Sequence, residues 1–284
     1  MENEVHYGMT QPISEEIDAI KYRQTGEDFY SKVVRIAEAL KDSPDHFENF
    51  KDALRHMRFL PAGRVQNAMG AARQTTAFNC FVSGTIEDNM NSIMGRATEA
   101  AETMRRGGGI GYDFSNLRPR GNRIKSLDSR ASGAVSFMQI YDAVWQTIAS
   151  SGHRRGAQMG VLRIDHPDIE QFITAKNDGT SLTGFNISVG VTDEFMKCLE
   201  KKEPFPLQFE GVVHEEVDPV ALWDMIMRST WDWAEPGVLF IDTINKIIYQ
   251  KENWKKADDK EIYILFVPRR TIECDELLFE NNLF

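Results

Sequence analysis

Apolar side chains recur at helical spacing through the first part of the chain. In segment 27–41 they fall three or four positions apart, which places them on one face of a helix. Segment 46–57 shows a similar pattern, and Ser14, which is followed by acidic residues, is typical of a residue that caps the start of a helix. The pattern therefore predicts a helical N-terminal region over residues 1–60.

From Phe59 onward, short apolar runs alternate with longer amphipathic segments. The runs that predict strands are 79–82, 110–114, 160–164, 186–191 and 238–241. The segments that predict helices are 88–105, 133–149, 167–176, 193–201 and 219–233, and 206–216 is a candidate hairpin. Strand–helix alternation of this kind indicates right-handed crossovers and a largely parallel sheet. We therefore expect an α/β fold over residues 61–245.

Residues 246–284 follow neither pattern. They contain a charged stretch at 251–260, one apolar run at 261–267, and an end that is both acidic and apolar. We expect a separate, divergent tail here.

Composition narrows the class of protein. A net charge of −10 argues against a general nucleic-acid binder, because neutralising phosphates needs a basic face, although local basic pockets remain possible. No apolar run approaches the roughly 20 residues that span a bilayer, and the polar N-terminus is unlike a secretory signal. Three cysteines are too few for a disulfide scaffold. We expect a cytoplasmic protein with free thiols and with no membrane or nucleic-acid partner.

A run of glycines is the first candidate functional feature. Gly107, Gly108 and Gly109 follow a predicted helix, where they allow a ligand to approach the backbone and can form an anion-binding nest. Their spacing matches neither the dinucleotide-binding nor the phosphate-loop motif. A tight turn between helix and strand is the alternative interpretation.

A second feature is the segment 150–158, in which Arg154 and Arg155 stand between glycines. The guanidinium fork suits phosphates and base edges, so a ligand-contacting loop is favoured over a charged surface loop.

Cys80 lies in a short apolar run, where a core role and a redox role both remain open. His153 and His166 have no partner at metal-ligand spacing, so we predict no metal site.

The sequence His166-Pro167-Asp168 is typical of a helix entry, with Asp168 favouring the N-terminal end of the helix dipole.

Six motifs together resemble one family. They are FLPAGR at 59–64, NCFV at 79–82, EDNM at 87–90, RGGGIG at 106–111, RRGAQMGVL at 154–162 and FNISVGVTDEFM at 185–196. In order and approximate spacing they resemble the catalytic subunit of ribonucleotide reductase, over about residues 10–245. The amino-acid sequence of segment 154–162 is most similar to that of the adenosylcobalamin-dependent class II enzymes. A class I subunit that lacks the N-terminal ATP cone is the alternative.

The resemblance implies roles for individual residues. Cys80 matches one of the two cysteines that reduce the ribose and become a disulfide. Asp88 and Arg118 match residues that contact the effector, a deoxynucleoside triphosphate, and residues 115–122 match the first specificity loop.

The segment 150–158 matches the second specificity loop. The resemblance implies that Ser151, Arg154 and Gln158 contact the effector and that Arg155 faces the substrate. It also implies that the substrate lies near Asn79, Gly108 and Gly109.

The family's fold is a ten-stranded α/β barrel of two five-stranded halves, of which this chain would supply the helical region and roughly the first half. The radical-bearing Asn-Pro-Cys-Gly-Glu loop that follows a motif such as PGVLFID at 236–242 does not occur in the sequence. We therefore expect a split enzyme that needs a C-terminal partner chain, with a truncated fragment as the alternative. The missing half would supply most of the contacts that hold adenosylcobalamin.

The resemblance further implies a homodimer through the specificity site and reduction by thioredoxin or glutaredoxin. A class I enzyme would also need a radical-generating small subunit. Two other functions stay open: a non-catalytic module that binds deoxynucleotides or forms oligomers, and an unrelated α/β nucleotide enzyme. A neighbouring gene that begins near Asn-Pro-Cys-Gly-Glu would favour the split enzyme.

Overall fold

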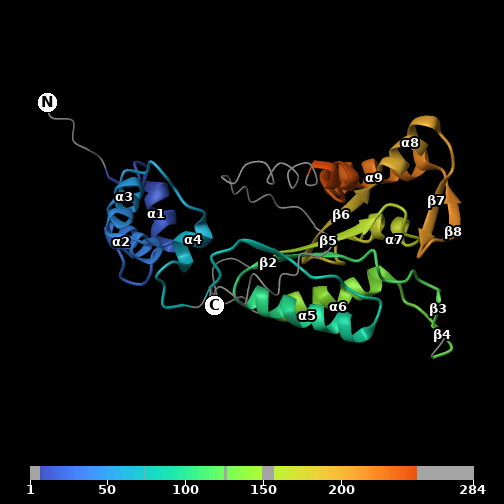
Figure 1. Cartoon of the computed structure of the whole chain (residues 1–284), viewed down its shortest axis with the longest axis horizontal. Helices are drawn as coiled ribbons and strands as arrows, with labels where there is room; N and C mark the ends of the chain where they lie inside the picture. Colours follow the sequence, from blue (N-terminus) through green and yellow to red (C-terminus); the bar gives the residue numbers. More distant parts are fainter. Residues whose placement is uncertain (1–6, 74, 125–126, 149–156, 248–284) are drawn as a thin grey trace.

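The computed structural model describes residues 7–73, 75–124, 127–148 and 157–247. Within these ranges a small helical unit precedes a parallel sheet that is covered by helices on both faces (Figure 1). The helices of the first unit are α1 (Pro12–Lys21), α2 (Phe29–Leu40), α3 (Pro44–Arg55) and α4 (Gly63–Ala68). The predicted helical N-terminal region is therefore present, and α4 is an addition to it.

Local side chains set where these helices begin. Asp28 and Ser43 cap α2 and α3, since their side chains accept hydrogen bonds from the backbone N–H groups of Ser31 and His46. The expectation that Ser14 caps the first helix was wrong. Helix α1 begins at Pro12, whose fixed φ and missing N–H suit the first helical position.

Buried polar contacts hold the helical unit together. Lys32 of α2 forms an ion pair with Asp18 of α1, and its Nζ donates to Oε1 of Gln66 over 3.2 Å. Gln66 belongs to α4 and donates in turn to the Pro61 carbonyl oxygen over 2.8 Å. All three side chains are almost fully buried, so each requires these partners. Helix α4 is therefore fixed to α1 and α2.

The sheet contains β1 (Cys80–Val82), β2 (Gly109–Asp113), β5 (Gln158–Arg163), β6 (Phe185–Val191) and β9 (Gly237–Phe240). Its order is β1-β2-β5-β6-β9, and every neighbouring pair is parallel. The five predicted strands and the parallel sheet are confirmed. The described strands form an open sheet with β1 and β9 at its edges, so the sheet does not close into a barrel.

Helices cover both faces of the sheet (Figure 1). The pair α5 (Met90–Arg105) and α6 (Ala134–Thr147) lies on one face, and α8 (Asp193–Lys201) and α9 (Pro219–Trp233) lie on the other. The short helix α7 (Ile169–Thr174) packs against β5 and α9. All five helices were predicted, with differences of a few residues at their ends.

Two antiparallel hairpins project from this framework. The pair β7 (Phe205–Phe209) and β8 (Val212–Val217) is the predicted hairpin, whereas β3 (Arg123–Ile124) and β4 (Ser129–Arg130) were not predicted. Strands of two residues are too short to show an alternating pattern. The apolar run at 261–267 lies outside the described residues.

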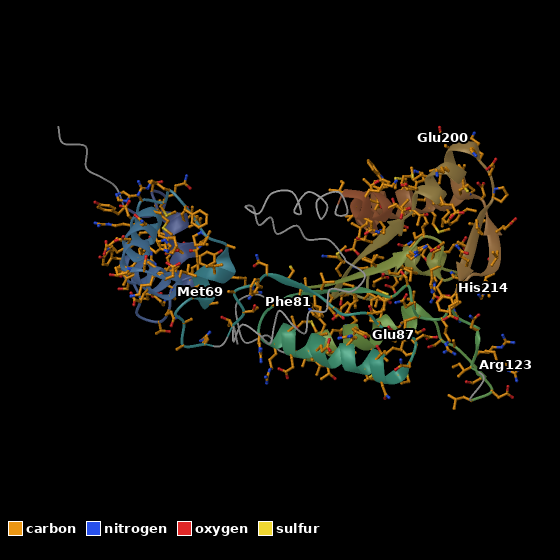
Figure 2. The ribbon with its side chains drawn as sticks, viewed as in Figure 1. Met69, Phe81, Glu87, Arg123, Glu200 and His214 are labelled. Carbon is orange, nitrogen blue, oxygen red and sulfur yellow. The ribbon has the colours of Figure 1, made fainter. Side chains whose placement is uncertain are left out.

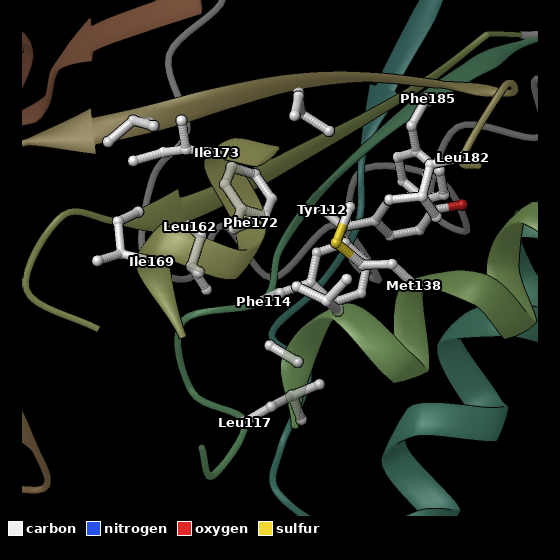
Figure 3. Close-up of a cluster of buried hydrophobic side chains, with 14 of the residues drawn as sticks. Tyr112, Phe114, Leu117, Met138, Leu162, Ile169, Phe172, Ile173, Leu182 and Phe185 are labelled. Atoms are coloured by element: carbon white, nitrogen blue, oxygen red, sulfur yellow. The ribbon is translucent and has the colours of Figure 1, made fainter. Parts of the chain in front are cut away.

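Aromatic side chains dominate the main core. Tyr112 of β2 and Phe114, directly after β2, meet Tyr141 of α6 with ring centroids 4.9 and 5.4 Å apart, and Met138 and Phe185 pack beside them (Figure 3). Edge-to-face contacts of this kind add to the stabilisation from burial. Strand β2 is therefore the centre of the layer between the sheet and α6.

No helix among the described residues is long and apolar enough to cross a membrane.

Replacing Phe114 by alanine should lower the free energy of unfolding by about 3–5 kcal/mol, because the side chain is fully buried and its loss leaves a cavity. Phe59, which is 63% exposed, provides the control. Phe59→Ala should change the free energy of unfolding by less than about 0.5 kcal/mol. Urea unfolding of both variants measures the difference. Equal losses would contradict the assignment of the core.

Candidate functional site

The predicted site residues that the structure describes fall at two opposite ends of the sheet. Cys80 and Gly109 are the first residues of β1 and β2 and lie next to each other in register. Asp88 and Arg118 follow these strands and therefore belong to the other end. Figure 2 labels Phe81, beside Cys80, at the end nearer the helical unit, and Glu87, beside Asp88, farther along. We call the end of the sheet with Cys80 and Gly109 the amino end, and the end with Asp88 and Arg118 the carboxyl end.

At the amino end, an exposed thiol lies against glycine backbone. Cys80 is exposed and is not in a disulfide, and its edge strand leaves it accessible. A Cβ atom on residue 109 would lie 3.5 Å from the Cys80 Sγ and 3.1 Å from the Ala157 carbonyl oxygen. The Asn79 carbonyl oxygen accepts from the Gly109 N–H over 2.9 Å. Predicted residues Asn79, Cys80 and Gly109 therefore lie together, with Gly108 directly adjacent.

Arg64 is a neighbour of this end that sequence reasoning left without a role. It belongs to α4, and a Cβ atom on residue 107 would lie 2.5 Å from its Nη1. The guanidinium group therefore lies against the glycine run. The signal in the sequence was the arginine within the motif at 59–64, but its distance from the glycines along the chain concealed the contact.

At the carboxyl end, the structure brings together two residues that are distant in sequence. Nε of Arg118 donates to Oδ2 of Asp88 over 2.5 Å, with side chains that are 31% and 24% exposed. Asp88 directly precedes the cap of α5, Asn89, whose side chain accepts from the Ser92 N–H. The start of a helix carries partial positive charge. An arginine beside such a start is suited to bind a phosphate.

A buried polar turn supports this end. Asp168, which is 7% exposed, accepts hydrogen bonds from the backbone N–H groups of Arg120, over 2.9 and 3.2 Å, and of Ala134, over 3.0 Å. It precedes α7 as expected, but its side chain does not cap that helix. The predicted helix entry is therefore confirmed, whereas the hydrogen bonds of the Asp168 side chain go to other elements. Its carboxylate binds the first residue of α6.

His166 is held in one tautomer by its contacts. Its Nδ1 accepts from the Asp168 N–H over 3.0 Å, and its Nε2 lies 2.8 Å from the Leu117 carbonyl oxygen, to which only an N–H can donate. The proton must therefore be on Nε2. Burial lowers the pKa of His166 below its ordinary value, against the opposing effect of the Leu117 carbonyl and the acids Asp168, Asp165 and Asp113.

Gln158 occupies a different place from the one expected for an effector contact. Its side chain is 1% exposed; Oε1 accepts from the Tyr112 hydroxyl over 2.9 Å and Nε2 donates to the Tyr141 carbonyl oxygen over 3.2 Å. Burial raises the pKa of Tyr112, so the hydroxyl remains a donor. Gln158 therefore joins β2, β5 and α6 within the core. Ser151, Arg154 and Arg155 lie outside the described residues.

Comparison with known proteins identifies what this arrangement resembles. The family model described as "Ribonucleotide reductase, barrel domain" matches residues 78–259, which is more than half of the chain. The vitamin B12-dependent ribonucleoside-diphosphate reductase of Mycobacterium tuberculosis (strain CDC 1551 / Oshkosh) is 41% identical over 202 residues, which cover 70% of this chain and 29% of the relative. The reductase of the same name from Thermoplasma acidophilum is 32% identical over 255 residues, with 86% and 33% coverage.

A solved structure shows the same fold. The Actinobacillus ureae class Id ribonucleotide reductase alpha subunit superposes with a TM-score of 0.71 over 86% of this chain and 43% of its own, at 20% sequence identity. At that identity the likeness concerns the fold alone. The chain spans about a third or less of the length of the curated relatives named above.

The buried imidazole predicts a pH dependence of stability. Because the pKa of His166 is lower in the folded state, its contribution is fully present above the unfolded value of about 6.5 and is lost as the pH falls below it. His166→Gln keeps a donor and an acceptor without a titrating group, so its unfolding free energy should fall less steeply below about pH 6.5. Urea titrations between about pH 7.5 and 5 measure the slope.

The exposed His214 provides the control, because His214→Gln should retain the slope of the original protein. Indistinguishable slopes for His166→Gln and the original protein would contradict the neutral, buried state assigned to His166.

Proposed function

Since this chain belongs to the ribonucleotide reductase family, we propose that it forms the N-terminal part of the catalytic barrel of a B12-dependent ribonucleotide reductase. Together with the remainder of the barrel it converts ribonucleotides to deoxyribonucleotides. The observation that carries the proposal is the exposed Cys80 thiol on an edge strand, placed against the backbone of Gly109. The names of the relatives favour the B12-dependent class.

Cys80 supplies one of two thiols in the reduction. Replacing the ribose 2′-hydroxyl by hydrogen releases water and consumes two electrons and two protons. Two thiols provide both when they become a disulfide, and a thioredoxin-type dithiol regenerates them by exchange. The second thiol comes from the remainder of the barrel. Cys80 is suited to this pairing because its edge strand can receive a neighbouring chain segment.

In this class of enzyme, adenosylcobalamin supplies the radical that starts the reaction. The described residues near Cys80 offer the thiol, the Asn79 and Ala157 carbonyl oxygens, glycine backbone and the Phe81 ring. We assign none of these groups to the cofactor. The remainder of the barrel holds it.

The carboxyl end of the sheet is the proposed effector site. The ion pair of Arg118 with Asp88, next to the start of α5, supports binding of a deoxynucleoside triphosphate there. Arg154 and Ser151, for which the resemblance implies effector contacts, and Arg155, for which it implies a substrate contact, lie outside the described residues and stay part of the proposal. The site lies at the interface of a homodimer. The packing of Gln158 supports a structural contribution of that residue to the layer beneath the loop.

Effector binding can be measured directly. Calorimetry with each of the four deoxynucleoside triphosphates should detect at least one that binds, and Arg118→Met should weaken that binding about tenfold or more, because a hydrogen bond to a charged group is lost. Arg58→Met is the matched control, since Arg58 forms an exposed ion pair with Asp52 in the helical unit. If no triphosphate binds to the folded chain or to the assembled enzyme, the effector site is misassigned.

The role of Cys80 predicts a specific loss of turnover. In the enzyme assembled from this chain and the remainder of the barrel, Cys80→Ser should abolish multiple turnover with a thioredoxin-type reductant. Cys198→Ser in α8 should leave turnover unchanged. Deoxyribonucleotide formed per enzyme is the measurement, and the chain alone should form none. Full turnover by Cys80→Ser, or product from the chain alone, would contradict the proposal.

A further inference from the structure

The loop that carries Arg118 is anchored on both sides of that residue. We call residues 115–122 the Arg118 loop and residues 165–168 the clamp turn. Leu117, which is fully buried, offers its carbonyl oxygen to His166, and Arg120 offers its N–H to Asp168. Arg118 lies between these two anchor points, with its side chain directed to Asp88. The clamp turn therefore fixes the backbone from which Arg118 extends.

A third anchor comes from the strand that leads into the clamp turn. The Arg163 N–H donates to the Ser115 Oγ over 2.9 Å, and the Arg163 guanidinium forms two hydrogen bonds with Asp165, of 2.9 and 2.6 Å. The loop is thus attached to the end of β5 at its first residue as well. Leu117 itself packs at the edge of the main core (Figure 3).

The same carboxylate also fixes the start of α6. Oδ2 of Asp168 accepts from the Ala134 N–H, and Gly133 before it has a φ of 89°. A Cβ atom on residue 133 would lie 2.6 Å from that oxygen, so only glycine lets the two approach. Helix α6 ends at Thr147, just before the second specificity loop. One side chain therefore holds both the Arg118 loop and the helix that leads to the other loop.

The burial of these groups makes the contacts strong. Asp168 and His166 are 7% and 2% exposed, so a broken contact leaves a buried donor or acceptor without a partner. An asparagine at 168 has one carbonyl oxygen in place of two carboxylate oxygens and carries no charge, so it cannot hold Arg120 and Ala134 equally well. The clamp turn therefore favours a single arrangement of the Arg118 loop.

We infer that Asp168 and His166 are positioning residues for the effector site, which hold Arg118 in its binding position and tie it to the start of α6. This inference rests on the proposed function, because it assigns the effector to Arg118. Neither residue contacts the effector in this inference; both act through the backbone of the Arg118 loop.

The test compares Asp168→Asn with Asp178→Asn in the full chain. Asp178 is the matched control, because its carboxylate also accepts from two backbone N–H groups, those of Thr180 and Ser181, in a loop remote from Arg118. Asp168→Asn should weaken binding of the preferred deoxynucleoside triphosphate about tenfold and accelerate hydrogen exchange at the amides of residues 117, 118 and 120–122 by a similar factor. Asp178→Asn should change neither, even if both variants unfold at a lower temperature.

A second pair of variants keeps the inference testable if Asp168→Asn does not fold. His166→Gln can still donate to Leu117 and accept from Asp168, so it should bind the triphosphate nearly as well as the original protein. His166→Ala can do neither and should bind about tenfold more weakly. A purely structural role would lower the unfolding temperature without this difference in affinity.

The outcomes separate the two proposals. If the original protein binds a triphosphate and Asp168→Asn binds it equally, with unchanged exchange at 117–122, the positioning role is overturned. Equal affinities of the two His166 variants would overturn it as well. If the original protein binds none of the four triphosphates, the effector assignment fails, and hydrogen exchange alone then decides whether the clamp turn orders the Arg118 loop.

Discussion

All five strands of the sheet run in one direction, so their first residues meet at one end and their last residues at the other. This constraint separates Cys80 from Arg118. Strand β5 has six residues and spans about 17 Å, so a ligand at Arg118 cannot directly touch Cys80 at the amino end. Any influence of one end on the other must pass through elements that reach both. Strand β5 and helix α6, which is about 21 Å long, are such elements.

Buried polar contacts join β5 and α6 near both ends of the sheet. At the carboxyl end, Asp168 in the turn after β5 holds Ala134, the first residue of α6. Toward the amino end, Gln158, the first residue of β5, donates to the Tyr141 carbonyl oxygen of α6. Buried polar groups that are fully partnered favour one arrangement over others, because every alternative leaves some of them without partners. The strand and the helix are therefore joined to each other near both ends of the sheet.

The helical N-terminal unit lies at the amino end of the sheet. Its buried pair of Lys32 and Asp18, together with Gln66, fixes α4, and Arg64 of α4 lies against Gly107. A buried ion pair contributes more to a unique geometry than to stability, because desolvation offsets most of the attraction. In this protein the unique geometry places a guanidinium group beside the glycine run, two residues from Gly109. The helical unit is thus part of the surroundings of the candidate substrate site.

The sequence by itself determined the longer elements and the family. Hydrophobic periodicity predicted five parallel strands and the helices between them, because the period of burial is a local property of each element. Family motifs indicated Cys80, Asp88 and Arg118. Whether those residues have the implied roles remains a prediction, but their positions follow from the order of motifs and strands.

Only the tertiary structure decided which groups meet. It paired Asp88 with Arg118, turned the Asp168 carboxylate to α6 in place of α7, and buried Gln158 between two tyrosines. The short elements α4, β3 and β4 also escaped prediction, since a few residues carry no readable period. The physical reason is common to these cases. A sequence pattern reports how each residue relates to its own element, whereas the partner of a polar group depends on the path of other segments through space.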